Sequence, residues 1–466
     1  MGTADSTANT EQDYRLLTTA AERAELIARI KKVGHFCFDT ETTGLDPMEA
    51  EIVGASFSVL PNEAFFIHFP ESMPRAEVVQ VLGEFQEVLA SSDILKIGQN
   101  LKYDILMLRN YGIAVAGPMF DTMLAHYVID PNGKHGMDAM SQELLNYVPI
   151  SIETLIGKKG KKQLSMRDVE IEPLVQYAAE DADITLRLYE KLAPQVKDNF
   201  VFEHIEQPLM PVLADMEFQG IRLDQQALAE YSVELEQRIA TLEKDIYKAA
   251  GEEFNLNSPK QLGEILFDKL GLGAGGKAKK TKTGQYQTDE QVLSALAVKH
   301  ELPAQLLAYR GLQKLKSTYV DSLPKLINSK TGRIHTTFSQ SVAVTGRLSS
   351  VNPNLQNIPI RTADGREVRK GFIPRDDEHV LLSADYSQVE LRIIAAMSKD
   401  PGMMEAFQQG EDIHRATAAR VFGVPPEEVT SGQRSGAKTV PHGGQRDYRR
   451  LFCPVSARQG LYGRVD

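Results

Sequence analysis

The stretch HFCFDTET, residues 35–42, begins as a strand and ends in two carboxylates. Its aromatic and apolar residues are typical of a buried strand. Asp39 and Glu41 are two positions apart, so both side chains leave the same face of that strand. Two carboxylates held together repel each other unless a cation lies between them. A lone D-x-E pattern is more often a helix cap or a surface acid, so a metal site needs further ligands nearby.

The sequence around this strand alternates between strand and helix patterns. Runs rich in β-branched and aromatic residues predict three more strands, at 51–60, 63–69 and 94–100. Apolar residues spaced three and four apart predict helices at 76–91, 102–112 and 172–192. We therefore expect an α/β domain over residues 14–195, behind a polar and disordered leader at 1–13.

Three further residues of this region are candidates for the same site. Asp104 falls in the first turn of the predicted helix 102–112, and Tyr177 and Asp181 are four residues apart in the helix 172–192. Each has a structural explanation when taken alone, since helix N-termini favour acids and i,i+4 pairs are common. The set becomes specific only when all five residues are considered in order along the chain.

In that order, Asp39, Glu41, Asp104, Tyr177 and Asp181 resemble the tyrosine branch of the DEDD superfamily of 3′–5′ exonucleases. The resemblance implies a ribonuclease-H-like fold, with a mixed sheet flanked by helices. It also implies that the four acids hold two divalent ions, Mg²⁺ or alternatively Mn²⁺, while Tyr177 orients the attacking water. The chemistry agrees, because two metal ions can activate a water and stabilise a leaving oxygen, and hard cations prefer oxygen ligands.

From about residue 203 to 330 the pattern becomes helical. One long amphipathic helix is predicted at 227–250, and a second helix is predicted to start with Ser258 as N-cap and Pro259 at its first position. A Gly- and Lys-rich loop at 271–284 follows. Strand patterns return after 331, in GRIHTTFSQSV and HVLLSADYS, and helices are predicted after residue 387.

The chain resembles family A, the bacterial polymerase-I-like DNA polymerases, and the resemblance covers residues 14 to about 440. It is carried by KIGQNLKYDILML, YAAEDADITLRLYEKL, TGRLSSVNPNLQNIP, LLSADYSQVELRIIAAMS and DIHRATAARVFG. It implies a thumb at 196–330 and a palm with the start of the fingers at 331–440, as in a Klenow-like fragment without a preceding 5′-nuclease domain. Contacts with DNA are implied for Asn100, Lys277, Lys279, Lys280, Arg310, Lys314, Arg347, Asn354 and Gln356.

The resemblance also assigns the nucleotide site of the palm. Asp385 matches a palm carboxylate that binds a catalytic metal ion, and Glu390 matches the position that excludes ribose. His414, Arg434 and Lys438 match residues that meet the incoming triphosphate.

The family pattern ends at RSGAKTVPHGGQRDYRR, residues 434–450. Arg434 and Lys438 are in register, but His442 and Arg446 stand where the family has Phe and Tyr, and Pro441 should end the helix near Val440. The second palm carboxylate block never appears, so two-metal nucleotidyl transfer is expected to fail. We expect the tail 441–466 to come from a shifted reading frame or a broken gene; the alternative is a genuine short protein.

Composition limits the remaining choices. The net charge of -11 argues against a protein that coats nucleic acid nonspecifically, and the two cysteines fit a reducing cytoplasm. No run of 18 apolar residues occurs, so no membrane partner is expected. The expectation is a monomeric, bacterial, cytoplasmic and nucleoid-associated 3′–5′ exonuclease of DNA replication and repair. The alternatives are an inert DNA-binding remnant and a ribonuclease D-like RNA exonuclease.

Overall fold

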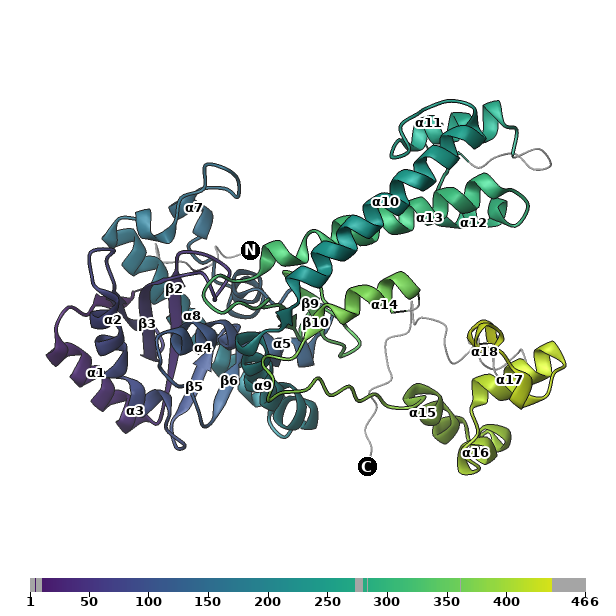
Figure 1. Cartoon of the computed structure of the whole chain (residues 1–466). Coiled ribbons are helices and arrows are strands. Elements are labelled where there is room, and N and C mark those ends of the chain that lie inside the picture. Colours follow the sequence, from purple (N-terminus) through teal and green to yellow (C-terminus); the bar gives the residue numbers. More distant parts are fainter. Residues whose placement is uncertain (1–4, 6–10, 273–279, 283, 361, 438–466) are drawn as a thin grey trace. The chain divides into compact units, whose positions relative to one another are not determined.

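The computed structural model describes residue 5 and residues 11–272, 280–282, 284–360 and 362–437 of the 466-residue chain. It separates into two compact units, one ending at Val380 and one beginning at Leu381. The first unit contains a sheet domain followed by a largely helical region, and the second is helical (Figure 1). Each unit is described by itself below.

A six-stranded mixed sheet forms the centre of the sheet domain, in the order β1-β4-β3-β2-β5-β6. β2 pairs antiparallel with β3 on one side and parallel with β5 on the other, so it lies inside the sheet. The strands are β1 Asp13–Leu16, β2 His35–Thr42, β3 Ile52–Leu60, β4 Glu63–His68, β5 Leu95–Gly98 and β6 Met119–Asp121. The α/β fold expected from the sequence is confirmed, and the strand register places Asp39 and Glu41 on a central strand.

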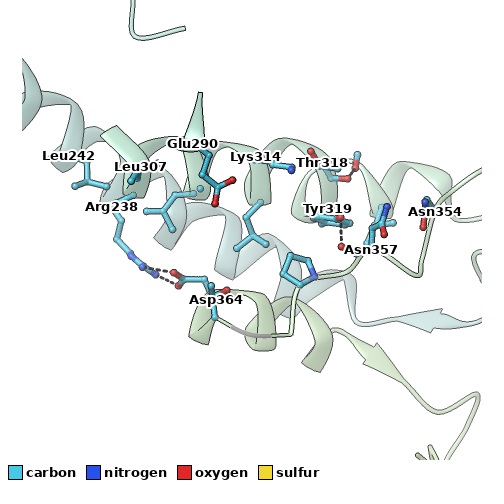
Figure 2. A pocket seen from close by; sticks show the side chains of 18 of the residues that line it. Arg238, Leu242, Glu290, Leu307, Lys314, Thr318, Tyr319, Asn354, Asn357 and Asp364 are labelled. Atoms are coloured by element: carbon cyan, nitrogen blue, oxygen red, sulfur yellow. Dashed lines mark hydrogen bonds and ion pairs between the residues drawn. The ribbon is translucent and has the colours of Figure 1, made fainter. Parts of the chain in front are cut away.

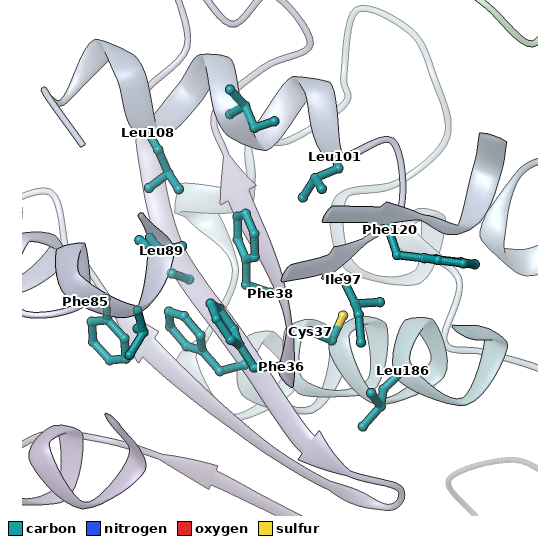
Figure 3. Close-up of a cluster of buried hydrophobic side chains, with 14 of the residues drawn as sticks. Phe36, Cys37, Phe38, Phe85, Leu89, Ile97, Leu101, Leu108, Phe120 and Leu186 are labelled. Atoms are coloured by element: carbon teal, nitrogen blue, oxygen red, sulfur yellow. The ribbon is translucent and has the colours of Figure 1, made fainter. Parts of the chain in front are cut away.

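Helices cover both faces of this sheet. Because side chains alternate along a strand, Phe36 and Phe38 of β2 point to one face and Cys37 to the other, where Leu186 of α8 lies (Figure 3). The helices of the domain are α1 Ala20–Val33, α2 Arg75–Gly83, α3 Gln86–Leu89, α4 Leu101–Asn110, α5 Thr122–Ile129, α6 Met137–Met140, α7 Ile152–Ile156 and α8 Ile171–Val196, with short turns at Ser141–Leu145 and Met166–Asp168. The odd-numbered residues of β2 therefore face α8.

One predicted helix of this domain is interrupted. The pattern at 76–91 predicts a continuous helix, whereas the structure has α2 and α3 with a break at Glu84 and Phe85. Gly83 is a poor helix former, and the ring of Phe85 is fully buried and stacks on Phe57 of β3, with centroids 4.5 Å apart. Burial of this ring against the sheet outweighs helix continuity.

The helical region has its own hydrophobic core, built mainly from the long helices α10 Gln225–Ala250 and α13 Glu301–Leu315. The predicted Ser258 cap and Pro259 start are confirmed, since Ser258 accepts from the backbone of Gln261. The other helices are α9 Gln207–Gln219, α11 Pro259–Gly263, α12 Glu290–Ala297 and α14 Ala363–Lys370. Single helical turns occur at Phe202–Glu206, Glu264–Lys269, Lys316–Val320 and Leu323–Leu326. Two short strand pairs are present, β7 Arg222–Leu223 with β10 Phe372–Ile373 and β8 Thr337–Ser339 with β9 Ser349–Val351.

The described part of the second unit, residues 381–437, consists of an irregular segment followed by short helices. They are α15 Val389–Ser398, α16 Pro401–Gln408, α17 Ile413–Phe422 and α18 Ser431–Ala437, with a 3₁₀ turn at Pro426–Glu428. The helices predicted after residue 387 are confirmed.

The strand predicted in HVLLSADYS is wrong, because residues 379–386 form no strand. A strand needs a neighbour to pair with its backbone groups, and no described strand pairs with this segment. Its apolar side chains remain exposed, including Val380 at 85% and Leu382 at 90%.

None of the described helices is both long and apolar enough to cross a membrane. The tail 441–466, with the helix end predicted near Val440, lies outside the described residues.

Candidate metal centre and nucleic-acid interface

Three carboxylates from two elements meet at the end of β2. Ligand oxygens of Asp39, Glu41 and Asp181 all lie within 4.8 Å of one another, and we call these three residues the acidic centre. Asp39 and Glu41 are odd-numbered residues of β2 and face α8, which carries Asp181 in its middle. Strand alternation and the packing of α8 thus assemble residues that are about 140 positions apart in the sequence.

The acidic centre has the electrostatics of a cation site. Burial raises the pKa of Asp39 to about 7. Burial, and then the Asp39 carboxylate, raise the pKa of Glu41 well above its usual value, and burial with both neighbours does the same for Asp181. Glu41 Oε1 and Asp181 Oδ1 are buried without a hydrogen-bond partner among the described residues. Unpaired buried oxygens of this kind fit a hard divalent cation.

Asp104 lies beside the acidic centre, and hydrogen bonds from Thr40 hold its carboxylate. It is in the first turn of α4, as predicted, and is almost fully buried. Its Oδ1 accepts hydrogen bonds from the Thr40 backbone N–H at 3.0 Å and from the Thr40 hydroxyl at 2.5 Å. Burial, and then the nearby Asp39, raise its pKa well above the usual range. Asp104 therefore contributes a fourth buried carboxyl, approaching from the opposite face of β2.

Tyr177 lies on α8 one turn before Asp181, as the i,i+4 spacing predicts. Burial raises the pKa of Tyr177 far above its usual value, and the carboxylates of Asp181, Glu41 and Asp39 act in the same direction. The hydroxyl consequently stays protonated at the edge of the acidic centre. It hydrogen-bonds the Asp181 carboxylate.

Sequence reasoning missed Thr40, which anchors Asp104, and the buried pair of Lys102 and Glu217. The Lys102 ammonium donates to Glu217 of α9 and to the carbonyl of Phe338 in β8, while Glu217 also accepts from the Phe338 N–H at 2.6 Å. The alternation of β2 places Thr40 on the opposite face of the strand from Asp39, but it does not indicate the contact with Asp104. No local pattern indicates the contact of Lys102, because its partners are more than 100 residues away.

Two cavities contain residues predicted to contact DNA. One, of about 480 Å³, is lined by Asn100, the residue that precedes α4 with a φ of 56°, and by residues of β8. The other, of about 1440 Å³, lies between α10, α13 and the segment 353–364, and is lined by Lys314 and Asn354 among others (Figure 2). Arg238 of α10 closes one side of it through an ion pair of 2.7 Å with Asp364.

The remaining predicted DNA contacts are spread over the helical region. Lys280 and Arg347 are exposed, whereas the half-buried Arg310 donates to the carbonyl of Thr288. Gln356 donates to the Leu348 carbonyl at 3.1 Å. Lys277 and Lys279 lie outside the described residues. The structure thus brings Lys314 and Asn354 to one cavity and Asn100 to the other, and Gln356 lies beside Asn354, whose Oδ1 accepts from the Gln356 backbone N–H at 3.0 Å.

The predicted nucleotide-site residues fall in the second unit. Asp385 is on the exposed segment before α15, and Glu390 is exposed in the first turn of that helix. Arg434 of α18 pairs at 2.6 Å with Asp412, which caps the helix that carries His414. Lys438 lies outside the described residues.

Comparisons with known proteins give two family matches, one in each half of the chain, and relatives that match nearly all of it. Residues 14–197 match the family described as 3′-5′ exonuclease, and residues 225–444 match DNA polymerase family A. The DNA polymerase I of Pseudomonas aeruginosa is 45% identical over 95% of this chain and 49% of that protein. The DNA polymerase I of Rhizobium leguminosarum is 44% identical over 90% of this chain and 43% of that protein. The chain spans about half the length of these relatives.

A solved structure extends the agreement to the fold. The structure titled as the POL domain of Pol1 from M. smegmatis in complex with DNA primer-template and dNTP has a TM-score of 0.72 at 32% identity, covering 91% of this chain and 70% of that one. Such exonuclease and polymerase domains generally use divalent metal ions, and the acidic centre fits that chemistry. The chain belongs to family A of the DNA polymerases and carries a 3′–5′ exonuclease domain followed by part of the polymerase domain.

Proposed function

We propose that this protein removes nucleotides from the 3′ ends of DNA with the help of two divalent ions, Mg²⁺ in the cell and Mn²⁺ as a substitute. The observation that carries the proposal is the acidic centre, where the buried Glu41 and Asp181 converge with the half-buried Asp39 and no ion pair with a described Lys or Arg compensates their charge. The proposed ligands are Asp39, Glu41 and Asp181, with Asp104 as the fourth acid. The proposed exonuclease domain is residues 14–195.

The residues around the acidic centre have distinct proposed roles. Bound divalent ions would lower the pKa of a water molecule and neutralise the charge on the scissile phosphate. Tyr177, kept protonated, holds the attacking water by its hydroxyl. Thr40 fixes the Asp104 carboxylate through two hydrogen bonds, so that the acid is already oriented before substrate binds.

Primer-template DNA is the proposed partner of the helical region. The structural relative named above is a complex with DNA primer-template, which supports this proposal. In the proposed division, residues 196–330 are the thumb and 331–440 the palm with the start of the fingers. Asn100, Lys280, Arg310, Lys314, Arg347, Asn354 and Gln356 would contact the DNA, as would Lys277 and Lys279. Phosphate contacts of this kind would give affinity without sequence preference.

Nucleotidyl transfer is the second candidate function, because family membership favours it. Asp385 would be its metal ligand, and Glu390, His414, Arg434 and Lys438 would meet the nucleotide. Among the described residues, however, Asp385 is exposed on an irregular segment and joins no group of three potential metal ligands. Because His442 and Arg446 stand where the family pattern has Phe and Tyr, we propose that this chain lacks polymerase activity. A monomer in the bacterial cytoplasm, associated with the nucleoid, completes the proposal, and sedimentation of the purified chain tests its oligomeric state.

Digestion of matched DNA and RNA oligonucleotides tests the substrate class. Each oligonucleotide carries a 5′ label and is incubated with the protein and Mg²⁺, with an EDTA control. We expect Mg²⁺-dependent shortening of DNA from its 3′ end at a rate well above that of RNA. Faster digestion of RNA would favour the ribonuclease D-like alternative. Binding of DNA without shortening would favour the inert remnant.

A further inference from the structure

Two histidines face each other near the C-terminal end of α5, outside the acidic centre. His126 Nδ1 and His135 Nδ1 are 2.9 Å apart, and the two rings are steeply inclined at 66°. His126 is 3% exposed, whereas His135 is half-buried. We call these two residues the histidine pair. At this distance one Nδ1–H can donate a hydrogen bond to the other Nδ1, and the unprotonated nitrogens could instead bind one metal ion.

A carboxylate lies against the same edge of the histidine pair. Asp130 follows α5, and its Oδ1 accepts a hydrogen bond from the Asn132 N–H at 3.1 Å. A Cβ built on Gly133 would lie 2.9 Å from both Asp130 Oδ2 and the Cε1 of His126. The second carboxylate oxygen and the imidazole edge therefore border one small space, which a side chain at residue 133 would fill.

The surrounding contacts fix the orientation of His135. Its backbone carbonyl accepts from the Gln99 amide at 2.8 Å, its ring hydrogen-bonds the Pro131 carbonyl, and the ring of Tyr127 packs edge-on against it. Metal-binding histidines are commonly oriented in this way by a backbone carbonyl. The half-buried position of His135 also gives an ion a path from solvent.

We propose that the histidine pair binds one divalent transition-metal ion through its two Nδ1 atoms, with Asp130 as a carboxylate ligand. With metal–nitrogen distances of about 2.0–2.1 Å, nitrogens 2.9 Å apart subtend an angle of about 90° at the ion. This angle fits the tetragonal nitrogen and oxygen sites of Cu²⁺ and Ni²⁺ better than a tetrahedral Zn²⁺ site. The site is distinct from the acidic centre, which offers only oxygen ligands.

Asp130 would join the two nitrogens only after a turn of its side chain. Among the described residues, three potential ligand atoms within 4.8 Å of one another occur only in the acidic centre. Rotation of Asp130 would exchange its hydrogen bond with Asn132 for a bond to the ion, while water fills the remaining positions. Metal binding would thereby tie the loop 130–136 to α5.

This loop forms part of the wall of the 480 Å³ cavity, which His135 and Gly136 line together with Gln99 and Asn100. An ion at the histidine pair would hold that wall against α5. The expected effect of the metal is therefore structural, on the rim of the cavity. It does not require the ion to take part in phosphodiester cleavage.

Electron paramagnetic resonance of Cu²⁺ tests the proposal, because hyperfine coupling to nitrogen distinguishes imidazole from carboxylate ligands. Tag-free protein is titrated with Cu²⁺ in the presence of excess Mg²⁺, and Ni²⁺ is titrated in parallel by calorimetry. We expect one tight site with two nitrogen ligands. His126→Gln and His135→Gln should each weaken it by on the order of 100-fold, because losing even an outer partner of a metal site costs 10–100-fold.

His204→Gln is the matched control, since His204 is an exposed ring in the same unit. Circular dichroism of the metal-free variants shows whether they fold, and the half-buried His135 gives a variant with little packing to lose. Identical Cu²⁺ spectra and affinities in the wild type and in His135→Gln would overturn the proposal. That result would leave the histidine pair as two imidazoles that share a hydrogen bond.

Discussion

Neighbouring residues at the end of β2 have different roles, because they point to opposite faces of the strand. Asp39 and Glu41 face α8, while Thr40 between them faces α4 and holds Asp104 by two hydrogen bonds. The sequence predicts the first half of this arrangement, because the i,i+2 rule places both acids on one face. It does not predict that Asp104 is anchored to Thr40, since that contact depends on how α4 packs 64 residues later.

Thr40→Val tests this anchor. The substitution removes the hydroxyl donor and leaves the buried Asp104 carboxyl with the backbone N–H alone. We expect a loss of about 1–3 kcal/mol in the free energy of unfolding, the range for a buried group that loses a partner. Urea unfolding measures it, and Thr40→Ser, which restores the hydroxyl, should recover most of the loss. Equal stability of the Val variant and the wild type would contradict the anchor.

The raised pKa of Asp39 predicts a dependence of stability on pH in the metal-free protein. The folded state holds a proton on this carboxyl up to about pH 7, whereas the unfolded chain releases it near 3.8. The folded state therefore binds more protons across this window, and its stability should fall as the pH rises through it. Urea unfolding in EDTA from pH 4 to 8 measures the fall, and Asp39→Asn should reduce it. A wild-type stability that rises over this range would contradict the assignment.

At the scale of elements, regular periodicity was the reliable signal. The strands β2, β3 and β4 and the long helices α8 and α10 appear close to where their patterns predict them. The patterns failed where tertiary contacts decide: Phe85 packs into the core and interrupts a helix, and the segment 379–386 forms no strand because no described strand pairs with it. In both cases the local structure depends on residues that are distant in the sequence, which a local pattern does not show.

Gly54 tests the packing of β3 against its neighbour. A Cβ at this position would lie 2.1 Å from the Phe66 ring and 2.8 Å from the Ile67 carbonyl oxygen. Gly54→Ala should therefore destabilise the sheet domain by about 1–3 kcal/mol through overpacking. Gly83→Ala is the control, because it meets nothing within 4 Å in an exposed helical position and should be neutral or slightly stabilising. Thermal unfolding compares the two variants, and an unaffected Gly54→Ala protein would contradict this packing.

At the scale of the whole molecule, the sheet domain and the helical region of the first unit are joined by a buried ion pair. Lys102 is on α4, two residues before Asp104, and its partners Glu217 and Phe338 belong to α9 and β8. The side chains of Lys102 and Glu217 are 10% and 5% exposed, so each buried charge depends on the other. This link makes the position of α4 depend on residues far along the chain, which no local pattern can reveal.

Lys102→Met should destabilise the first unit by about 3–5 kcal/mol, because it leaves the Glu217 carboxylate buried without a cation. Lys330→Met is a matched control, since its pair with Glu49 spans 3.6 Å between exposed side chains and should cost less than about 1 kcal/mol. The double variant Lys102→Met with Glu217→Gln should lose less than the sum of the single losses. Additive losses in urea unfolding would show that the two side chains are not coupled.

The measurement that tests the central claim most directly follows the length of a 5′-labelled primer annealed to a template. The purified chain is incubated with it, Mg²⁺ and all four deoxynucleotides, beside an Asp181→Ala variant. The acidic centre predicts shortening of the primer by the wild type and loss of that shortening in the variant. A primer that is lengthened would contradict the proposed absence of polymerase activity, and shortening that persists in Asp181→Ala would contradict the acidic centre as the site of cleavage.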